Sequence, residues 1–142
     1  MRALVTGGAG FIGSHLVDEL VDAGYSVKII DNLSSGNLAL VNHQIAAGNA
    51  EFIEGDITSI DDVLQATKEV DVVFHMAANP DIRLGTQVTD TDLKQGTIAT
   101  YNILEAMRIN NVSKIVFASS SVVYGEDAPM PTPESFGPCL PI

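Results

Sequence analysis

The 142-residue chain has no tryptophan, one cysteine and few basic residues. The single cysteine, Cys139, cannot form a disulfide within the chain and cannot build a metal site without other ligands, so no metal is predicted. Seven basic residues stand against 18 acidic ones, which gives a formal net charge of −11. The basic residues are also scattered along the chain. Because nucleic-acid binding depends on clustered positive charge, we expect no nucleic-acid partner.

Long apolar runs are absent too. No stretch reaches the ~20 apolar residues that a membrane-spanning helix needs, and the N-terminus lacks the pattern of a signal peptide. We therefore expect no membrane partner and a cytoplasmic location, where a lone cysteine stays reduced. The hydrophobic share of 46% is typical of one globular domain. The length is short for an enzyme that also needs a separate substrate domain.

Glycines are abundant near the start of the chain. After the apolar pair Leu4-Val5, glycines occur at Gly7, Gly10 and Gly13, and Gly24 follows a helical pattern. The apolar positions of that pattern are Phe11, Ile12, Leu16, Val17, Leu20 and Val21. A strand, a glycine turn and a helix in this order bind the pyrophosphate of a dinucleotide: Gly7 allows the tight turn, Gly10 a close approach of backbone to phosphate, and Gly13 close packing of helix on strand. The free N–H groups at the helix start would face the phosphates.

An acidic residue follows the second predicted strand. Residues 26–30 alternate and are rich in β-branched side chains, and Asp31 comes next, 24 residues after Gly7. At about this distance an acidic residue binds the adenosine ribose hydroxyls. The carboxylate would repel a 2′-phosphate, and no basic residue lies between Lys28 and Lys68. NAD is therefore favoured over NADP, although a turn or capping role for Asp31 is the alternative.

Three further strands are predicted, at 51–54, 70–75 and 113–118, with helices between them. This alternation indicates an α/β protein with a Rossmann-type, doubly wound parallel sheet of strand order 3-2-1-4-5. We expect residues 1–142 to form one NAD-binding domain, truncated before the sixth strand and without a substrate domain. The glycine turn, Asp31, residues 76–79 and residues 119–121 would then meet at the carboxyl ends of the strands.

The longest helical pattern covers about residues 90–110. Its predicted core stripe consists of Leu93, Gly96, Thr97, Thr100, Tyr101, Leu104 and Met107 or Arg108. Part of this stripe could also form a subunit interface, so a homodimer is expected for the full-length form. His75, at the end of the fourth strand, is interpreted as a hydrogen-bonded core histidine rather than a ligand. The five prolines at 129–141 exclude regular structure there.

Five motifs in this order resemble the extended short-chain dehydrogenase/reductase family, in its NAD-dependent nucleotide-sugar epimerase/dehydratase branch. They are the segments 6–15 (TGGAGFIGSH), 31–36 (DNLSSG), 55–57 (GDI), 75–78 (HMAA) and 119–125 (SSSVVYG). The resemblance implies a nucleotide-sugar substrate, with UDP-hexose 4-epimerases the nearest in pattern. It implies these cofactor-binding residues: Gly7, Gly10, Phe11, Ile12, Gly13, Asp31, Asn32, Ser34, Ser35, Gly36, Asp56, Ile57, Met76, Ala77, Ala78 and Ser119.

The same resemblance implies a reaction in which a hydride is removed to give a 4-keto sugar and is then returned. Ser121 would bind the reacting hydroxyl, and a Tyr-x-x-x-Lys pair would remove its proton. No tyrosine in the chain has a lysine four residues later, so the 142 residues alone are expected to be inactive. Val122-Val123 stand where related dehydratases carry Asp-Glu, which favours epimerisation. A non-catalytic NAD-binding or regulatory module and a 4,6-dehydratase fragment remain the alternatives; a P-loop or flavodoxin-like domain is disfavoured because the P-loop Gly-Lys-Ser/Thr ending is missing.

Overall fold

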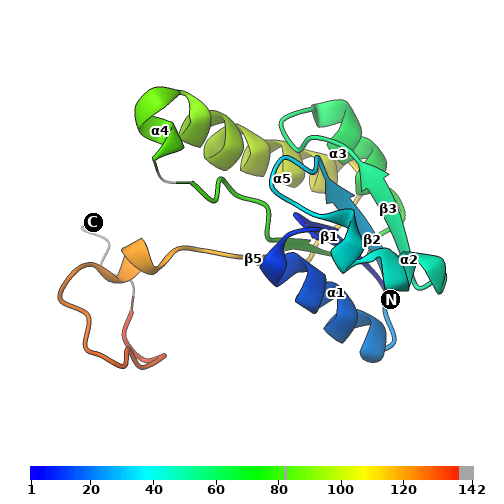
Figure 1. Ribbon diagram of the computed structural model, residues 1–142, viewed down its shortest axis with the longest axis horizontal. Helices are drawn as coiled ribbons and strands as arrows, with labels where there is room; N and C mark the ends of the chain where they lie inside the picture. The colour runs from blue at the N-terminus through cyan, green and yellow to red at the C-terminus, as the bar shows by residue number, and fades with distance from the viewer. Residues whose placement is uncertain (82, 138–142) are drawn as a thin grey trace.

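The computed structural model describes residues 1–81 and 83–137 (Figure 1). Cys139 and the prolines at 138 and 141 lie outside the described residues. The five strands form one sheet in the order β3-β2-β1-β4-β5, and every neighbouring pair is parallel. The strands are β1 (Arg2–Thr6), β2 (Ser26–Asp31), β3 (Ala50–Glu54), β4 (Val72–His75) and β5 (Ile115–Phe117). The predicted fold class and strand order are confirmed.

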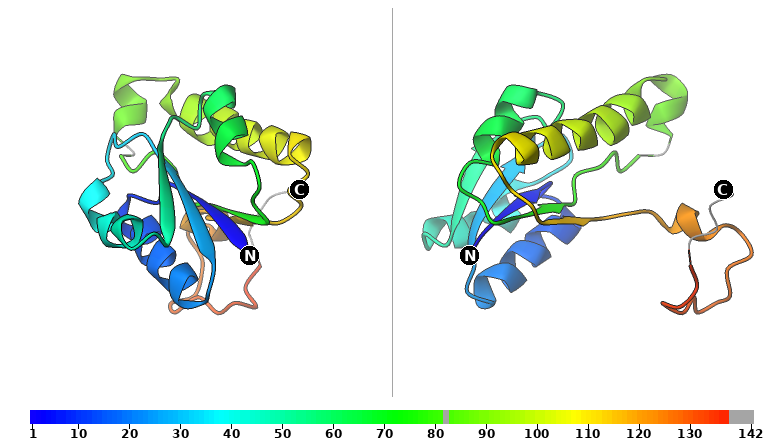
Figure 2. Two further views of the ribbon diagram at one scale, coloured as in Figure 1. Left: turned by 90° about the vertical axis from the view of Figure 1, so that its right-hand side faces the viewer. Right: turned by 180° about the vertical axis from the view of Figure 1, so that it is seen from behind.

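Helices cover both faces of this sheet (Figure 2). The helical elements are α1 (Phe11–Asp22), η1 (Leu38–Leu40), α2 (Asn42–Ala46), α3 (Ile60–Ala66), α4 (Leu84–Gln87), the π-helix η2 (Leu93–Ile98), α5 (Ala99–Ile109) and the 3-10 helix η3 (Ser121–Tyr124). Helices α1 and α2 lie on one side of the sheet, and α3 and α5 lie on the other. Each layer buries its own apolar cluster because successive strand residues point to opposite faces.

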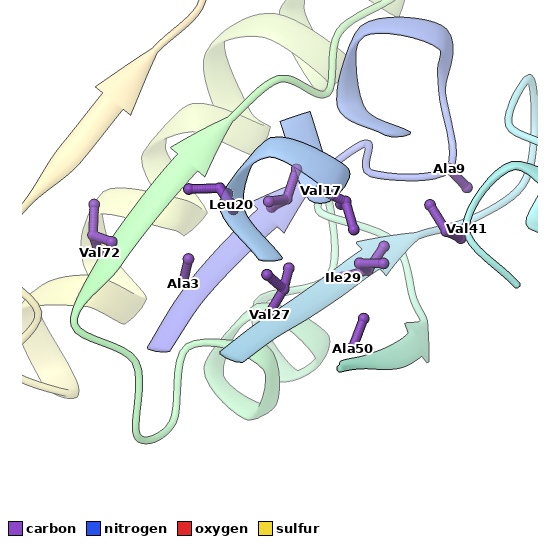
Figure 3. Close-up of a cluster of buried hydrophobic side chains, with 10 residues drawn as sticks. Ala3, Ala9, Val17, Leu20, Val27, Ile29, Val41, Ala50 and Val72 are labelled. Atoms are coloured by element: carbon purple, nitrogen blue, oxygen red, sulfur yellow. The ribbon is translucent and has the colours of Figure 1, made fainter. Parts of the chain in front are cut away.

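The first cluster lies between the sheet and α1. Val17 and Leu20 of α1 pack on Ala3 and Val5 of β1 and on the neighbouring β2 residues (Figure 3). The second cluster faces α3 and α5, where Leu4 of β1 packs with residues of both helices. The central strand β1 is therefore covered on both faces, which explains why its residues are apolar without alternation.

A glycine lies just before helix α1 and another lies just after it. Gly10 is its N-cap residue, and Gly24 follows its C-terminus with φ +83°. In this left-handed conformation the Gly24 N–H donates to the Val21 carbonyl, and the Tyr25 N–H donates to the Leu20 carbonyl. These bonds satisfy carbonyls that the helix end leaves free, so the predicted stop at Gly24 is confirmed.

The predicted core stripe of the long helix is wrong at most of its positions. Leu93, Tyr101 and Leu104 are 55%, 62% and 49% exposed. The residues that α5 buries are Ala99, Asn102, Ile103, Ala106 and Met107, and only Met107 belongs to the predicted stripe. The buried positions follow the i, i+3, i+4, i+7 spacing of one helix face, and the predicted stripe lies mostly on another face, because packing against α3 and the sheet decides which face of α5 is covered.

Strand β5 lies at the edge of the sheet and is poorly covered. Its residues Ile115, Val116 and Phe117 are 36%, 48% and 53% exposed. The chain that follows leads away from the sheet, and η3 lies apart from the other elements (Figure 1). The carboxyl ends of the five strands nevertheless share one edge of the sheet, and this edge carries the candidate site.

Candidate dinucleotide-binding site

The glycine turn, residues 7–10, follows β1 and lies against the end of β4. Gly7 has φ +67°, and a Cβ placed there would lie 2.8 Å from the Cα of Ala77. At Gly13, a Cβ would lie 2.1 Å from the Gly7 carbonyl oxygen. Both positions therefore require glycine, the first for backbone conformation and close approach, the second for helix packing. Gly8 is also required to be glycine, because a Cβ there would lie 2.7 Å from Cγ2 of Ile29. The sequence pattern did not indicate this.

Gly10 differs from these three glycines. Among the described residues that are not adjacent to it in the chain, its hypothetical Cβ has one neighbour within 4 Å, the Gly7 carbonyl oxygen at 3.2 Å. The space over Gly10 is thus open on the side away from the turn. No side chain caps the start of α1, and no acidic residue lies in its first turn. The positive end of the α1 dipole and its first N–H groups, at Phe11 and Ile12, are therefore available to an anionic group such as a pyrophosphate.

Asp31 lies at the carboxyl end of β2 and is buried. Its Oδ2 accepts a hydrogen bond from the Ala9 N–H at 3.0 Å, and its Oδ1 accepts one from the Leu33 N–H at 2.9 Å. The turn role that was the alternative for Asp31 is therefore present in the structure. The two hydrogen bonds use only part of its acceptor capacity, because a carboxylate has about four acceptor positions.

Asn32 connects the end of β2 to the end of β3. Its side-chain amide donates to Oδ2 of Asp56 at 3.0 Å, and its Oδ1 accepts from the Ser34 N–H at 3.0 Å. Burial alone would raise the pKa of Asp56, but hydrogen bonds from Thr58 and Asn32 outweigh it, and the pKa of this carboxyl is lowered. The structure thus brings together Asp31, Asn32 and Asp56 at the carboxyl ends of β2 and β3, while their roles in cofactor binding stay predictions.

A buried polar network lies behind the end of β4. The Thr6 hydroxyl accepts from the Ala77 N–H at 3.1 Å and lies 2.7 Å from Nδ1 of His75. His75 Nε2 lies 3.3 Å from the Thr100 hydroxyl, and burial lowers the pKa of this histidine. His75 is a hydrogen-bonded core residue, as predicted. Its network fixes Ala77 against Gly7, with Met76 and Ala78 on either side.

Asn102 of α5 is a further positioning residue that the sequence analysis missed. Its buried side chain donates to the carbonyl oxygens of Ile57 at 3.1 Å and Thr58 at 2.9 Å. These bonds hold the segment after β3 that carries Asp56 and Ile57. The sequence around Asn102 could not indicate this role, because the two carbonyl groups that it binds lie 44 and 45 residues earlier in the chain.

The serines 119–121 do not join the other predicted residues. All three are exposed, and the segment leads away from the sheet edge after β5 (Figure 2, right). The Ser120 hydroxyl accepts from the Val122 N–H at 3.4 Å at the start of η3. The roles of Ser119 and Ser121 therefore stay predictions.

Two shallow hollows lie at the opposite end of the strands. One is lined by Lys28, Gln65, Lys68, Glu69 and Asn110, and the other by Met1, residues 70–71 and residues 111–114. Neither touches the glycine turn. Across residues 1–81 and 83–137, no group of three or more histidine, cysteine, aspartate or glutamate side chains could hold a metal ion. In the same part of the chain, no helix is long and apolar enough to cross a membrane.

The doubly wound sheet, the glycine turn at an uncapped helix start and the acidic residue ending the adjacent strand define a Rossmann-type dinucleotide-binding domain. Residues 3–141 match the NAD dependent epimerase/dehydratase family, and the chain belongs to this family.

The chain is similar to proteins whose names describe different reactions. A UDP-glucose 4-epimerase of Halalkalibacterium halodurans is 36% identical over 143 aligned positions, covering 99% of this chain and 41% of that protein. A UDP-N-acetyl-alpha-D-glucosaminuronate decarboxylase of Bacillus cytotoxicus is 38% identical over 128 positions, covering 90% of this chain and 39% of that protein. The UDP-glucose 4-epimerase of Thermus thermophilus, solved in complex with NAD, is 35% identical with a TM-score of 0.82, covering 97% of this chain and 44% of that one. The chain spans about two fifths of the length of these relatives.

Proposed function

We propose that this chain is the NAD-binding part of a nucleotide-sugar 4-epimerase with a UDP-hexose as substrate. The observation that carries the proposal is the close approach of Gly7 to Ala77 beside the uncapped start of α1. The surroundings of the Gly10 Cβ position, where only the Gly7 carbonyl oxygen lies within 4 Å among the described residues not adjacent in the chain, would leave space for a pyrophosphate. The family membership and the relatives crystallised with NAD support the same cofactor.

The proposed cofactor contacts follow the carboxyl ends of the strands. The N–H groups of Phe11 and Ile12 would bind the pyrophosphate, and Asp31 with Asn32 would bind the adenosine ribose. The adenine would lie beside Asp56 and Ile57. The remaining proposed contacts come from Ser34, Ser35, Gly36, Met76, Ala77, Ala78 and Ser119.

NAD, when bound, would supply the oxidation of the sugar at C4 and its re-reduction. The task of this chain's own residues is to hold the cofactor and one end of the sugar, with Ser121 donating to or accepting from the reacting hydroxyl. Tyr25, Tyr101 and Tyr124 have no lysine four residues later. A tyrosine with a pKa near 10 is a weak base without such a cation. The 142 residues are therefore proposed to bind NAD without turnover.

Two further features bear on the reaction and the assembly. The decarboxylase among the relatives shows that the shared domain serves several reactions, and Val122-Val123 favour epimerisation because neither side chain can move a proton.

The exposed Leu93, Tyr101 and Leu104 lie along η2 and α5. We propose this surface as the contact between two copies in a full-length homodimer.

Calorimetric titration with NAD and with NADP tests the cofactor assignment. The unaltered chain should bind NAD more tightly than NADP, because Asp31 repels a 2′-phosphate. Asp31→Asn should weaken NAD binding by about tenfold or more, since a hydrogen bond to a charged group contributes about 1.5–3 kcal/mol. The matched control is Asp22→Asn, at the far end of α1, which should leave the affinity unchanged. Equal affinity for NAD and NADP in the unaltered chain would contradict the assignment.

A further inference from the structure

The loop of residues 32–37 lies against the Asp31 carboxylate at a glycine. A Cβ placed on Gly36 would lie 2.8 Å from Oδ1 and 3.1 Å from Oδ2 of Asp31, and 3.1 Å from the Cβ of Ala9. Gly36 is not one of the glycines with positive φ, so its backbone conformation does not require glycine. Glycine is required at position 36 for a steric reason, because the Asp31 carboxylate occupies the place of a Cβ.

Ala9 of the glycine turn is held by Asp31 at the end of β2 and by Asn37 of the 32–37 loop. Its N–H donates to Asp31 Oδ2 at 3.0 Å, and its carbonyl accepts from the Asn37 N–H at 2.8 Å. The Ala9 N–H is thus already used and is not offered to a phosphate. These two bonds make the orientation of the glycine turn depend on how closely the 32–37 loop approaches Asp31.

We propose that Gly36 is a positioning residue, which acts through Asp31 to fix both the ribose-binding carboxylate and the glycine turn. The inference rests on the proposed NAD function, but the contact on which it depends exists without ligand. It follows that the adenosine end and the pyrophosphate end of the site are coupled through one side chain, although Asp31 and Gly10 lie on separate segments.

Gly36→Ala tests this coupling without removing any group that would bind the cofactor, because a contact from Gly36 itself could come only from its backbone, which the substitution keeps. The new methyl group must displace either the loop or the Asp31 carboxylate, which is held by two N–H groups and cannot move freely. If the binding-competent arrangement is then populated in about one molecule in ten, the apparent affinity falls by about tenfold.

The experiment is a double-mutant cycle with Asp31→Ala, because that substitution removes the carboxylate and makes room for the methyl group. NAD and AMP are titrated against the unaltered chain, Gly36→Ala, Asp31→Ala and the double variant, and each melting temperature is measured without ligand. The matched control is Gly137→Ala, since a Cβ at Gly137 meets no atom of residues 1–81 or 83–137 within 4 Å apart from its chain neighbours. Amide exchange of the Ala9 N–H provides a direct measure of the turn.

Gly36→Ala should weaken NAD and AMP binding by about tenfold when Asp31 is present, and by less than about twofold when residue 31 is alanine. It should also speed the exchange of the Ala9 N–H. Equal weakening in both backgrounds would overturn the inference, because Gly36 would then act independently of Asp31. If the unaltered chain binds no NAD, the proposed function fails, and the melting temperatures decide: non-additive shifts support the contact and additive shifts overturn it.

Discussion

An added methyl group should lower the stability of the fold at Gly13 and the affinity for NAD at Gly10. At Gly13 the Cβ would lie 2.1 Å from the Gly7 carbonyl oxygen and 2.8 Å from the Cα of Gly8. Both atoms belong to the backbone of the turn, so Gly13→Ala must push α1 away from β1. At Gly10 the closest non-adjacent atom among the described residues is 3.2 Å from the Cβ, and a few tenths of an ångström of adjustment suffice.

The size of the effect follows from the packing of α1. Overpacking a core costs about 1–3 kcal/mol, and a clash with backbone rather than side chain places Gly13→Ala at about 3 kcal/mol or above. For 142 residues the unfolding entropy is about 300 cal/mol/K, so 3 kcal/mol corresponds to a fall of about 10 °C in melting temperature. Gly10→Ala replaces an N-cap glycine and should cost about 0.5–1 kcal/mol, or about 2–3 °C.

Calorimetric melting and NAD titration separate the two variants. Gly10→Ala should stay folded but lose NAD affinity by about a hundredfold, because the methyl group occupies the proposed pyrophosphate position. Gly13→Ala should lose stability first. A Gly13→Ala protein that melts within about 3 °C of the unaltered chain would refute the reasoning from close packing, and unchanged NAD binding by Gly10→Ala would refute the proposed position of the pyrophosphate.

Three further substitutions test the network behind the site. Thr6→Val removes the acceptor of the Ala77 N–H and the partner of His75, and should cost about 1–3 kcal/mol in urea unfolding. Burial lowers the pKa of His75 from 6.5 in the folded chain, so the unfolded chain binds the proton at a higher pH. The free energy of unfolding should therefore fall as the pH drops through about 6.5 towards the lowered pKa of the folded state. His75→Asn should reduce this pH dependence of stability between about pH 7.5 and 5.5. Asn102→Ala frees two carbonyl oxygens after β3, and should cost about 1–3 kcal/mol and speed amide exchange in that segment; unchanged exchange there would argue against its positioning role.

The features that the sequence predicted correctly are those set by neighbouring residues. The strand, glycine turn and helix at the N-terminus are local, because turn conformation and helix start depend on a few consecutive residues. The same holds for Gly24, which follows α1. Alternation of such units permits few sheet topologies, which is why the strand order followed.

The features that the sequence did not predict depend on contacts between distant segments. The buried side of α5 carries Ala99 and Ala106 rather than Tyr101 and Leu104, because packing against α3 and the sheet decides which face of the helix is covered.

The sequence alone determined the fold class, the glycine turn and the acidic residue that ends β2, since each is encoded by residue type and spacing. Only the tertiary structure showed that Asp31 holds Ala9, that Gly36 is confined by the Asp31 carboxylate, and that Asn102 holds the loop after β3. The physical reason is that the two sets of hydrogen bonds join residues 22 to 45 positions apart and form only once the layers have packed, while the Gly36 contact depends on where the folded loop places Gly36 against the Asp31 carboxylate.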